Sequence, residues 1–477
     1  MPTRCAAVLL VLLATSAVSA QDTPTEREAA REVLRKMATL EQSLDVPALV
    51  ARMSMPNAER DRVVARAKEL MDKELLALAD DIATHPEIGF EEKRSVSKLT
   101  DYLRQHNFSI ETGTAGLSTA FVAKFRQNNG SPVLGVILEY DALRGTRGAF
   151  HGDQHSAQGP VGMAAAIAVA EYLTRSRSPG SVVVYGTPGE EMMPPAAKTE
   201  MHKAKAFDGA EVIVRSHSSS VTARPAPGFG TCCLNIVGTK YTFSGAPTHQ
   251  MTPWNGRNAL TAMNLLFSNI DAIRSSVRPE ARIQGYIMEG GTAPNVVTDR
   301  TVADFYIRYP DEVYLDQVVE FVDNAAKAAA LVTGTKVKID HYSHLVDGVS
   351  LSTLGDLGFA YMKSFGATGV TETPGKPQGF EETGSVSRDI PGIGVSAQTS
   401  TFSNHTYEMD ADNLKEIGHQ GFIVDAQTMA AVLFDFATHA DYRAAVKQEF
   451  DGLKALFGEY QSALKKVSTV PTVPDPK

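Results

Sequence analysis

The sequence predicts an α/β fold, a mainly parallel sheet with helices on both faces, interrupted by an inserted α+β domain. From Thr119 onward, continuous apolar runs alternate with helix-like segments, a pattern typical of parallel strands buried on both faces. Polar residues follow several of these runs directly, as expected at the carboxyl edge of such a sheet, where ligands bind. Over residues 236–349 the pattern changes to long strands and helices, which indicates a second domain inside the first.

The length and charge of the chain limit its possible functions. A chain of 477 residues can form two or three domains, each with its own core. The net charge is −9, and Lys and Arg form no long block. We therefore expect no nucleic-acid partner, because such binding depends on neutralising phosphates with basic side chains.

The first residues have the pattern of an export signal. Arg4 precedes an uncharged apolar run, which ends in the small residues Val18, Ser19 and Ala20. This run is shorter than the roughly 20 residues that a membrane span needs. We predict a signal peptide over 1–20 and a periplasmic or secreted protein with no membrane span in the mature chain, an uncleaved anchor being the alternative.

The segment after the signal is expected to be mostly helical, since apolar residues recur at helical spacing through 25–83, with breaks near Pro47 and Pro56. Residues 21–63 form a helical N-terminal extension in this interpretation. Four strand-like runs follow, at 119–125, 132–143, 181–191 and 210–220. A helix is predicted between the second and third of them, at 160–174. The end of the chain, 466–477, is rich in proline and is predicted to be a disordered tail.

The loop "FHGDQHSAQGP" raises the possibility of a metal site. Asp153 and His155 stand two residues apart, so extended backbone would put both side chains on the same side. Taken alone, this spacing is found most often in a solvated polar turn. The spacing indicates a metal site only if the fold brings further ligand-type residues close to this loop.

A pair of adjacent carboxylates, Glu190 and Glu191, ends a second apolar run. Keeping both ionised in one cramped place is costly unless a cation or a proton compensates. Neighbouring side chains also point in different directions, so one can bind a metal while the other holds a water molecule for hydrolysis. An exposed acidic loop is the alternative interpretation.

Two histidines, His217 and His405, follow further strand-like runs. Neutral imidazole is a good ligand for zinc or manganese, although either residue alone could be structural. Four strand ends that all supply ligand-type residues rarely arise by chance. One Asp, one Glu and three His would suffice for two divalent metal ions, zinc or manganese.

The order of the motifs carries a family resemblance. "HPEIGFEE", "EYDAL", H-x-D-x-H, "GTPGEE", "RSH", "FSGAPTHQMTPWNGRNAL", "GGTAPNVVTDR" and "SNHTYEM" occur in this sequence between roughly Val64 and Phe450. This order resembles that of the aminoacylase and carboxypeptidase-type dinuclear metallopeptidases. The resemblance is strongest to the amidohydrolase branch that holds aminobenzoyl-glutamate hydrolase, hippurate hydrolase and the auxin-conjugate amidohydrolases.

The resemblance implies a role for each matching residue and a division into domains. It implies metal ligation by Asp153, His155, Glu191, His217 and His405. It makes Glu190 the general base, and His249 a histidine of the lid that stabilises the oxyanion, sometimes across a dimer interface. Asn295 would lie near the substrate, and His151 would support the metal loop. Residues 64–235 and 350–465 would form the catalytic domain, and 236–349 the lid and dimerisation domain of a homodimer.

Three departures from the branch affect this transfer. Asp153 replaces a cysteine, and Gln154 replaces the usual glycine. An aspartate should still bind metal, but its harder oxygen suits zinc and manganese alike. The N-terminal extension and the export signal also differ from the familiar members, which are mostly cytoplasmic, so the physiological substrate need not transfer.

We therefore expect a metal-dependent amidohydrolase that cleaves N-acyl amino acids or related small conjugates of the aminobenzoyl-glutamate type. A metal-activated water would attack, with Glu190 as general base. Arg257 and Arg308 are candidates for binding a substrate carboxylate, because guanidinium binds carboxylate in a bidentate way. The alternatives are an exported dipeptidase or carboxypeptidase of the same family and a non-catalytic metal- or solute-binding relative.

Overall fold

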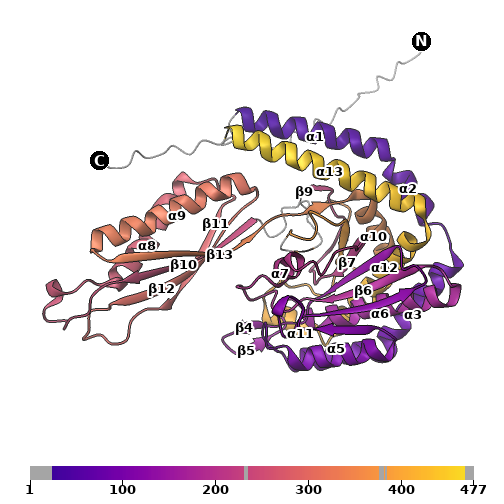
Figure 1. The fold of residues 1–477 in the computed structure, drawn as a ribbon, viewed down its shortest axis with the longest axis horizontal. Helices are drawn as coiled ribbons and strands as arrows, with labels where there is room; N and C mark the ends of the chain where they lie inside the picture. The colour runs from indigo at the N-terminus through magenta and orange to yellow at the C-terminus, as the bar shows by residue number, and fades with distance from the viewer. Residues whose placement is uncertain (1–23, 230–234, 375–380, 382–383, 468–477) are drawn as a thin grey trace, which may run out of the picture.

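The computed structural model describes residues 24–229, 235–374, 381 and 384–467. A larger α/β body carries a smaller unit of strands and two helices that projects to one side (Figure 1). The predicted signal peptide lies outside the described residues, as does most of the predicted tail.

The larger body contains a six-stranded sheet with the order β1-β2-β6-β3-β7-β16. Its strands are β1 (Ser109–Thr112), β2 (Phe121–Gln127), β3 (Val133–Leu138), β6 (Gly180–Gly186), β7 (Val212–Ser216) and β16 (Gly392–Val395). Strands β6, β3, β7 and β16 are parallel to one another, whereas β1 and β2 form antiparallel pairs at one edge. The predicted mainly parallel sheet is confirmed, and four carboxyl ends meet at one edge.

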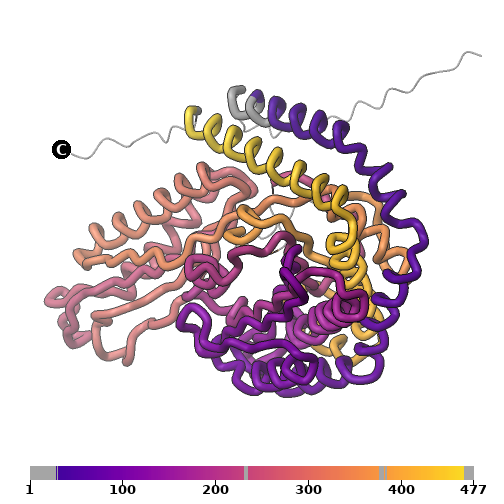
Figure 2. Tube along the Cα trace, turned by 45° about the vertical axis from the view of Figure 1, so that its right-hand side comes forward, coloured from indigo at the N-terminus to yellow at the C-terminus, as the bar shows by residue number. Residues whose placement is uncertain are grey.

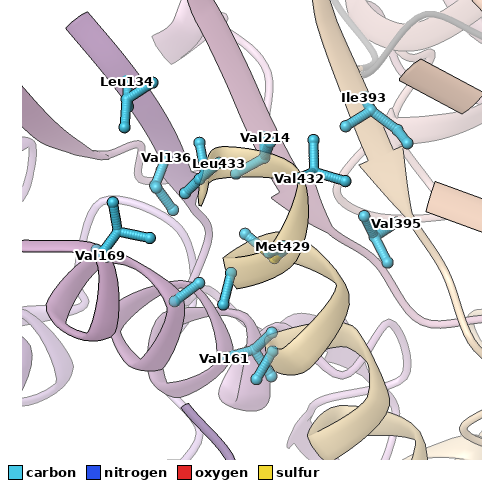
Figure 3. Close-up of a cluster of buried hydrophobic side chains, with 14 of the residues drawn as sticks. Leu134, Val136, Val161, Val169, Val214, Ile393, Val395, Met429, Val432 and Leu433 are labelled. Atoms are coloured by element: carbon cyan, nitrogen blue, oxygen red, sulfur yellow. The ribbon is translucent and has the colours of Figure 1, made fainter. Parts of the chain in front are cut away.

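Two long helices, α6 (His155–Ser176) and α12 (Glu416–Thr438), cover one face of this sheet. Figure 3 shows where they meet the strands, at Leu134, Val136, Val161, Val169, Val214, Ile393, Val395, Met429, Val432 and Leu433. Helix α12 is long and apolar enough to cross a membrane, but 78% of its apolar stretch is buried in the protein, as in the core helix of a soluble domain. Helix α7 (Ala197–Lys203) packs on the opposite face through Met201.

From residue 24 on, the N-terminal part forms the α-helices α1 (Pro24–Leu44), α2 (Val46–Met53), α3 (Ala58–Leu70), α4 (Leu76–Ala83) and α5 (Lys93–Gln105), with a π-helical turn, Met71–Leu75, between α3 and α4. The predicted breaks fall where Pro47 enters the first turn of α2 and where Asn57 caps α3. Helix α1 lies along α13 (Ala440–Val467), as Figures 1 and 2 both show. The ion pairs of Lys36 on α1 with Glu459 and of Arg52 on α2 with Asp441 show that the two chain directions are opposite.

The larger body also has short strands and two more α-helices. They are β4 (Leu143–Gly145), β5 (Gly148–Phe150), β8 (Thr222–Ala223), β9 (Gly228–Phe229), β14 (Val349–Ser350), β15 (Val370–Thr371), α10 (Ser352–Ser364) and α11 (Tyr407–Asp412). The helix predicted over 160–174 begins earlier, at His155, so the metal loop leads directly into it.

The smaller unit is an antiparallel sheet with the order β11-β12-β10-β13 and two helices packed against it. Its elements are β10 (Asn235–Ser244), α8 (Ala259–Ile273), β11 (Arg282–Glu289), β12 (Arg300–Tyr309), α9 (Glu312–Thr333) and β13 (Lys336–Leu345). Along β12, Phe305 and Ile307 point into the core beneath the helices. Because strand side chains alternate, Tyr306 and Arg308 point to the opposite face.

Candidate dinuclear metal centre

The parallel strands deliver chemically active side chains to one edge of the sheet. Glu139 follows β3, Glu190 and Glu191 follow β6, and His217 follows β7 directly. His405 lies in the loop after β16. The carboxyl edge predicted from the sequence is therefore the place where these groups gather.

Asp153, Glu191 and His405 form one group of possible ligands, whose donor atoms lie within 4.8 Å of one another. The Nε2 atom of His405 is 2.9 Å from Oδ2 of Asp153 and 3.5 Å from Oε2 of Glu191. Among the described residues, the second oxygen of Asp153 and that of Glu191 are buried without a hydrogen-bond partner. Buried carboxylate oxygens without partners are costly, so the group suits a cation.

His155 and His217 form a second group with Glu139, again within 4.8 Å. Nδ1 of His155 is 3.1 Å from Oδ1 of Asp141, and Nδ1 of His217 is 3.2 Å from the carbonyl oxygen of Ser218. Because these oxygens can only accept, each Nδ1 must donate. Each Nε2 is then the ring nitrogen that faces the other groups of the site, and it can bind a metal ion once it has given up its proton.

Buried charges surround Glu139. Lys198 Nζ contacts its Oε1, and Arg215 Nη2 lies 3.6 Å from its Oε2. Burial opposes ionisation of Glu139, but the charges of Arg215 and Lys198 outweigh it and hold the pKa of that carboxyl well below its usual range. Burial likewise opposes protonation of His155, yet Asp141 and Glu139 raise the pKa of its imidazole. The site therefore attracts positive charge.

The residues present fit a pair of divalent ions. Imidazole nitrogen and carboxylate oxygen are the donor types that zinc and manganese accept. Over the described part of the chain, the buried oxygens of Asp153 and Glu191 that have no hydrogen-bond partner supply lone pairs, and Nε2 of His155 supplies another once a metal ion displaces its proton. Glu190 belongs to a third group with His155 and Glu191, so it lies beside both sets of ligands.

The loop that carries Asp153 is a tight turn rather than the extended segment that the spacing suggested. Gln154 has φ of 54°, a left-handed conformation that favours glycine, and its side chain donates to the carbonyl oxygen of Met409. This turn sends Asp153 toward His405, while His155 begins α6 and faces Asp141.

His151 lies in the same loop and is buried. Its backbone N–H donates to Asp410, and its carbonyl oxygen accepts from Asn413. Burial, together with the charge of His155, lowers the pKa of its imidazole to about 3, so the ring is neutral.

A cavity of about 610 Å³ opens onto the ligands from the side of the smaller unit. Glu190, Glu191 and His405 line one wall, and Tyr306 and Arg308 of β12 line the other. Burial lowers the pKa of the Arg308 guanidinium, and the charge of Glu190 opposes this shift, so the two groups are within electrostatic reach. The cavity can therefore hold a small molecule between the ligands and a basic side chain.

Comparison with known proteins identifies the family. The chain is 31% identical over 365 residues to the Xaa-Arg dipeptidase of Homo sapiens, covering 70% of this chain and 80% of that protein. The chain belongs to the M20 family of metallopeptidases. It is also 31% identical over 277 residues to one of the subunits of the p-aminobenzoyl-glutamate hydrolase of Escherichia coli (strain K12), covering 55% of this chain and 56% of that protein.

Two further comparisons agree with the M20 assignment. Residues 234–333 match the model of the peptidase dimerisation domain. A solved Bacillus subtilis structure, described as a dinuclear metal binding peptidase from the M20 family, has the same fold, with a TM-score of 0.53 and 18% identity. The alignment covers 76% of this chain and 98% of that structure. The protein is thus an M20 amidohydrolase or peptidase, and the predicted resemblance is confirmed.

Three predicted site residues of this M20 enzyme, His249, Asn295 and Arg257, do not line the cavity of their own subunit. His249 and Asn295 meet at the far end of the smaller unit, where the backbone around His249 pairs with Val296. Strand β10 has ten residues, so its far end is about 30 Å from its start near the cavity. Arg257 also lies there, beside Gly334. Within one subunit, only Arg308 of the two candidate arginines lines the cavity.

Sequence reasoning missed several groups in the M20 site. Glu139, Lys198 and Arg215 were not predicted, although "LEYDAL" does place a charged residue at the end of an apolar strand. Glu92 was also missed, and its carboxylate accepts from the backbone N–H of Gly189, next to the glutamate pair. Of these four residues, only Glu139 could have been found from the sequence, because a carboxylate at the end of an apolar run stands out.

Proposed function

We propose that this M20 enzyme hydrolyses the amide bond of N-acyl amino acids or related small conjugates of the aminobenzoyl-glutamate type, with Glu190 as general base. The observation that carries the proposal is the position of Glu190. It lines the cavity and lies within 4.8 Å of the ligand-type atoms of His155 and Glu191. A carboxylate beside the metal ligands but open to the cavity suits proton transfer during hydrolysis.

Asp153, Glu191 and His405 would hold one ion, and His155 and His217 the other, with zinc or manganese the expected metals. Two such ions supply Lewis acidity, which activates water and polarises a carbonyl group. Glu190 then takes the proton of the attacking water and delivers it to the nitrogen of the leaving amine. Asp141 and Ser218 keep His155 and His217 in the orientation that binding requires.

Arg308 would bind the carboxylate of the released amino acid. It lies across the cavity from Glu190, and guanidinium forms paired hydrogen bonds with carboxylate. We retain Arg257 as a second candidate only for a dimer, because it lies at the far end of the smaller unit.

His249 and Asn295 would act from the partner subunit of a homodimer. Residues 234–333 match a dimerisation domain, which supports pairing through this unit. We propose that 236–349 form the lid and dimerisation domain, and that 64–235 and 350–465 form the catalytic domain. His249 would donate to the developing oxyanion at the site of the other subunit.

A dipeptidase is the second candidate function. The human relative is described as an Xaa-Arg dipeptidase, which favours a substrate with two amino acid residues. A non-catalytic binder is the weakest alternative, because a binder gains nothing from Glu190 beside the metal. For the mature protein we propose export to the periplasm or outside the cell, as the first 20 residues predict. N-terminal sequencing of the mature protein checks this directly.

The test of the proposed function is turnover by metal-free protein reconstituted with zinc or manganese. The panel comprises N-acyl amino acids, dipeptides and folate fragments. We expect hydrolysis of at least one N-acyl amino acid or aminobenzoyl conjugate, restored by metal. Faster turnover of dipeptides would favour the second candidate, and no turnover of any substrate with two ions bound would contradict the proposal.

A further inference from the structure

We propose that Arg388 is a positioning residue, which holds the smaller unit at the angle that places Arg308 across the cavity from Glu190. The inference rests on the carboxylate recognition by Arg308 in the proposed function and adds a residue that no motif assigns. Arg388 belongs to the segment 384–390 of the larger body and does not line the cavity. It would therefore act through Arg308 rather than on the substrate.

The segment 384–390 is anchored in the larger body. Val386 and Ile390 are buried in the apolar core on the α7 side of the six-stranded sheet. Gly384 has φ of 64° and lies directly against the linker that follows β13, because a Cβ atom there would be 1.9 Å from the carbonyl oxygen of Val346. No side chain fits between this segment and the linker.

Arg388 joins this segment to the linker and to the smaller unit. Its Nε donates to the carbonyl oxygen of Asp347 at 2.7 Å, and its Nη2 donates to Oδ1 of the same residue at 3.0 Å. Nη2 also forms an ion pair with Glu312, the first residue of α9. The side chains of Arg388 and Glu312 are 25% and 24% exposed, so water screens this pair less than a fully exposed one.

The partners of Arg388 are directly connected to the strand that carries Arg308. Glu312 follows Arg308 by four positions, just after the end of β12. The side-chain amide of Asn235 donates to the carbonyl oxygen of Pro310 at 2.8 Å, and its Oδ1 accepts from the backbone N–H of Asp347 at 2.9 Å. A shift of the linker or of the start of α9 should therefore move Arg308 as well.

The C-terminal helix α13 supports the same junction. The guanidinium carbon of Arg388 lies 4.8 Å from the centre of the Phe457 ring, and this ring packs against Phe229 of β9 at 4.9 Å. Phe229 pairs with Val349 of β14, so the strands before and after the smaller unit meet at this point. Contacts at such a junction can set the angle between the two units. The competing interpretation is that they only stabilise the fold.

The two interpretations predict different kinetics. A loss of stability alone lowers the fraction of active enzyme and leaves KM unchanged. A displaced Arg308 weakens the binding of substrates with a free carboxylate, whereas Glu190 and the metal ligands stay in place on the larger body. A displacement of about 1 Å is enough to reduce the contribution of a positioned group strongly.

The informative variants are Arg388→Met and Glu312→Gln, the second of which removes only the charge on the smaller unit. Each is also combined with Arg308→Met. Arg66→Met is the matched control, because Arg66 forms two hydrogen bonds with Glu171 between α3 and α6, both in the larger body, and its side chain is 31% exposed. Circular dichroism and metal analysis establish that each variant is folded and holds its ions.

The experiment measures kcat and KM for an N-acyl amino acid that the wild type hydrolyses and for its carboxamide, which lacks the free carboxylate. We expect Arg388→Met to raise KM for the acid at least about 5-fold with a smaller change in kcat, and Glu312→Gln to raise it less. KM for the carboxamide should not change, and Arg66→Met should have the wild-type KM for both. In the Arg308→Met background, neither variant should raise KM further, because effects that act through one residue are not additive.

A rise in KM by the same factor with and without Arg308 would overturn the positioning role, as would wild-type KM values in both Arg388→Met and Glu312→Gln. If Arg388→Met does not fold, Glu312→Gln alone decides by the same comparison. An unchanged KM in Arg308→Met itself would instead contradict the carboxylate recognition of the proposed function, and the positioning role with it.

Discussion

Nε2 of His405 lies 2.9 Å from Oδ2 of Asp153, although the two residues are 252 positions apart in the sequence. The backbone joins the same two loops, because the N–H of His405 donates to the carbonyl oxygen of Gly152. The loop after β16 and the loop before α6 thus form one unit. A substitution of Asp153 should therefore also change the position of the His405 side chain.

Replacing Asp153 with alanine removes an oxygen ligand and the partner of His405. We expect Asp153→Ala to lose at least one of two metal ions and to lower kcat/KM at least about 100-fold. Metal analysis together with turnover measures both effects. If Asp153→Ala retained two ions, the residue would be a bystander.

Asp153→Cys restores the ligand type of the related branch. A thiolate is softer than a carboxylate, so the ratio of zinc to manganese affinity should rise relative to the wild type. Competitive loading with both metals measures this ratio. A ratio equal to that of the wild type would mean that the residue does not contact metal.

Removing the charge of Arg308 should weaken the binding of substrates with a free carboxylate. A charge-assisted hydrogen bond contributes about 1.5–3 kcal/mol, so Arg308→Met should raise KM by roughly 10- to 100-fold with a smaller effect on kcat. Arg282→Met is a matched control, because Arg282 lies opposite Arg308 on the neighbouring strand β11 but does not line the cavity. Equal effects of the two variants would exclude carboxylate recognition by Arg308.

The position of His249 predicts complementation between subunits. His249→Ala and Glu190→Gln should each be inactive alone. When the two variants are mixed and exchange subunits, half of the dimers are mixed and one of their two sites carries both residues. Activity should therefore return to about a quarter of the wild-type value. If no activity returns although mixed dimers form, His249 does not act across the interface.

The buried carboxyl of Glu92 should make the stability of the metal-free protein depend on pH. Burial, reinforced by the charge of Asp141, raises its pKa from 4.5 to about 7. The folded state thus holds a proton that the unfolded state releases above pH 4.5. Stability is present below this value and is lost as the pH rises through 7, by at most about 3 kcal/mol.

Glu92→Gln keeps an acceptor for the N–H of Gly189 but cannot ionise. We therefore expect the melting temperature of Glu92→Gln relative to wild type to increase between pH 5 and pH 8, in the presence of a chelator. A difference that does not change with pH would show that Glu92 is not protonated in the folded state.

The carboxyl edge of the sheet and most of the candidate metal ligands could be predicted from the sequence. Strands of a parallel sheet are buried on both faces, so they read as continuous apolar runs whose ends are visible in a single sequence. Two such runs end shortly before Glu190 and His217. The start of α6 at His155 could not be predicted, since it depends on the left-handed conformation of Gln154. Glutamine gives no sign of such a conformation in the sequence.

Side-chain partners from distant segments were also beyond prediction. Glu139 looks like part of a strand, and only the structure places Lys198 and His155 beside it. The distance of His249 from the cavity follows from the length and direction of β10, which residue spacing does not specify. Tertiary geometry, rather than local pattern, decides these cases.

The most direct test of the central claim compares wild type with Glu190→Gln for both metal content and turnover of an N-acyl amino acid. Glutamine has nearly the same shape but cannot accept the proton. The account predicts two bound ions in both proteins and a loss of kcat of at least about 100-fold in Glu190→Gln. Unchanged turnover in Glu190→Gln with both ions bound would contradict the account.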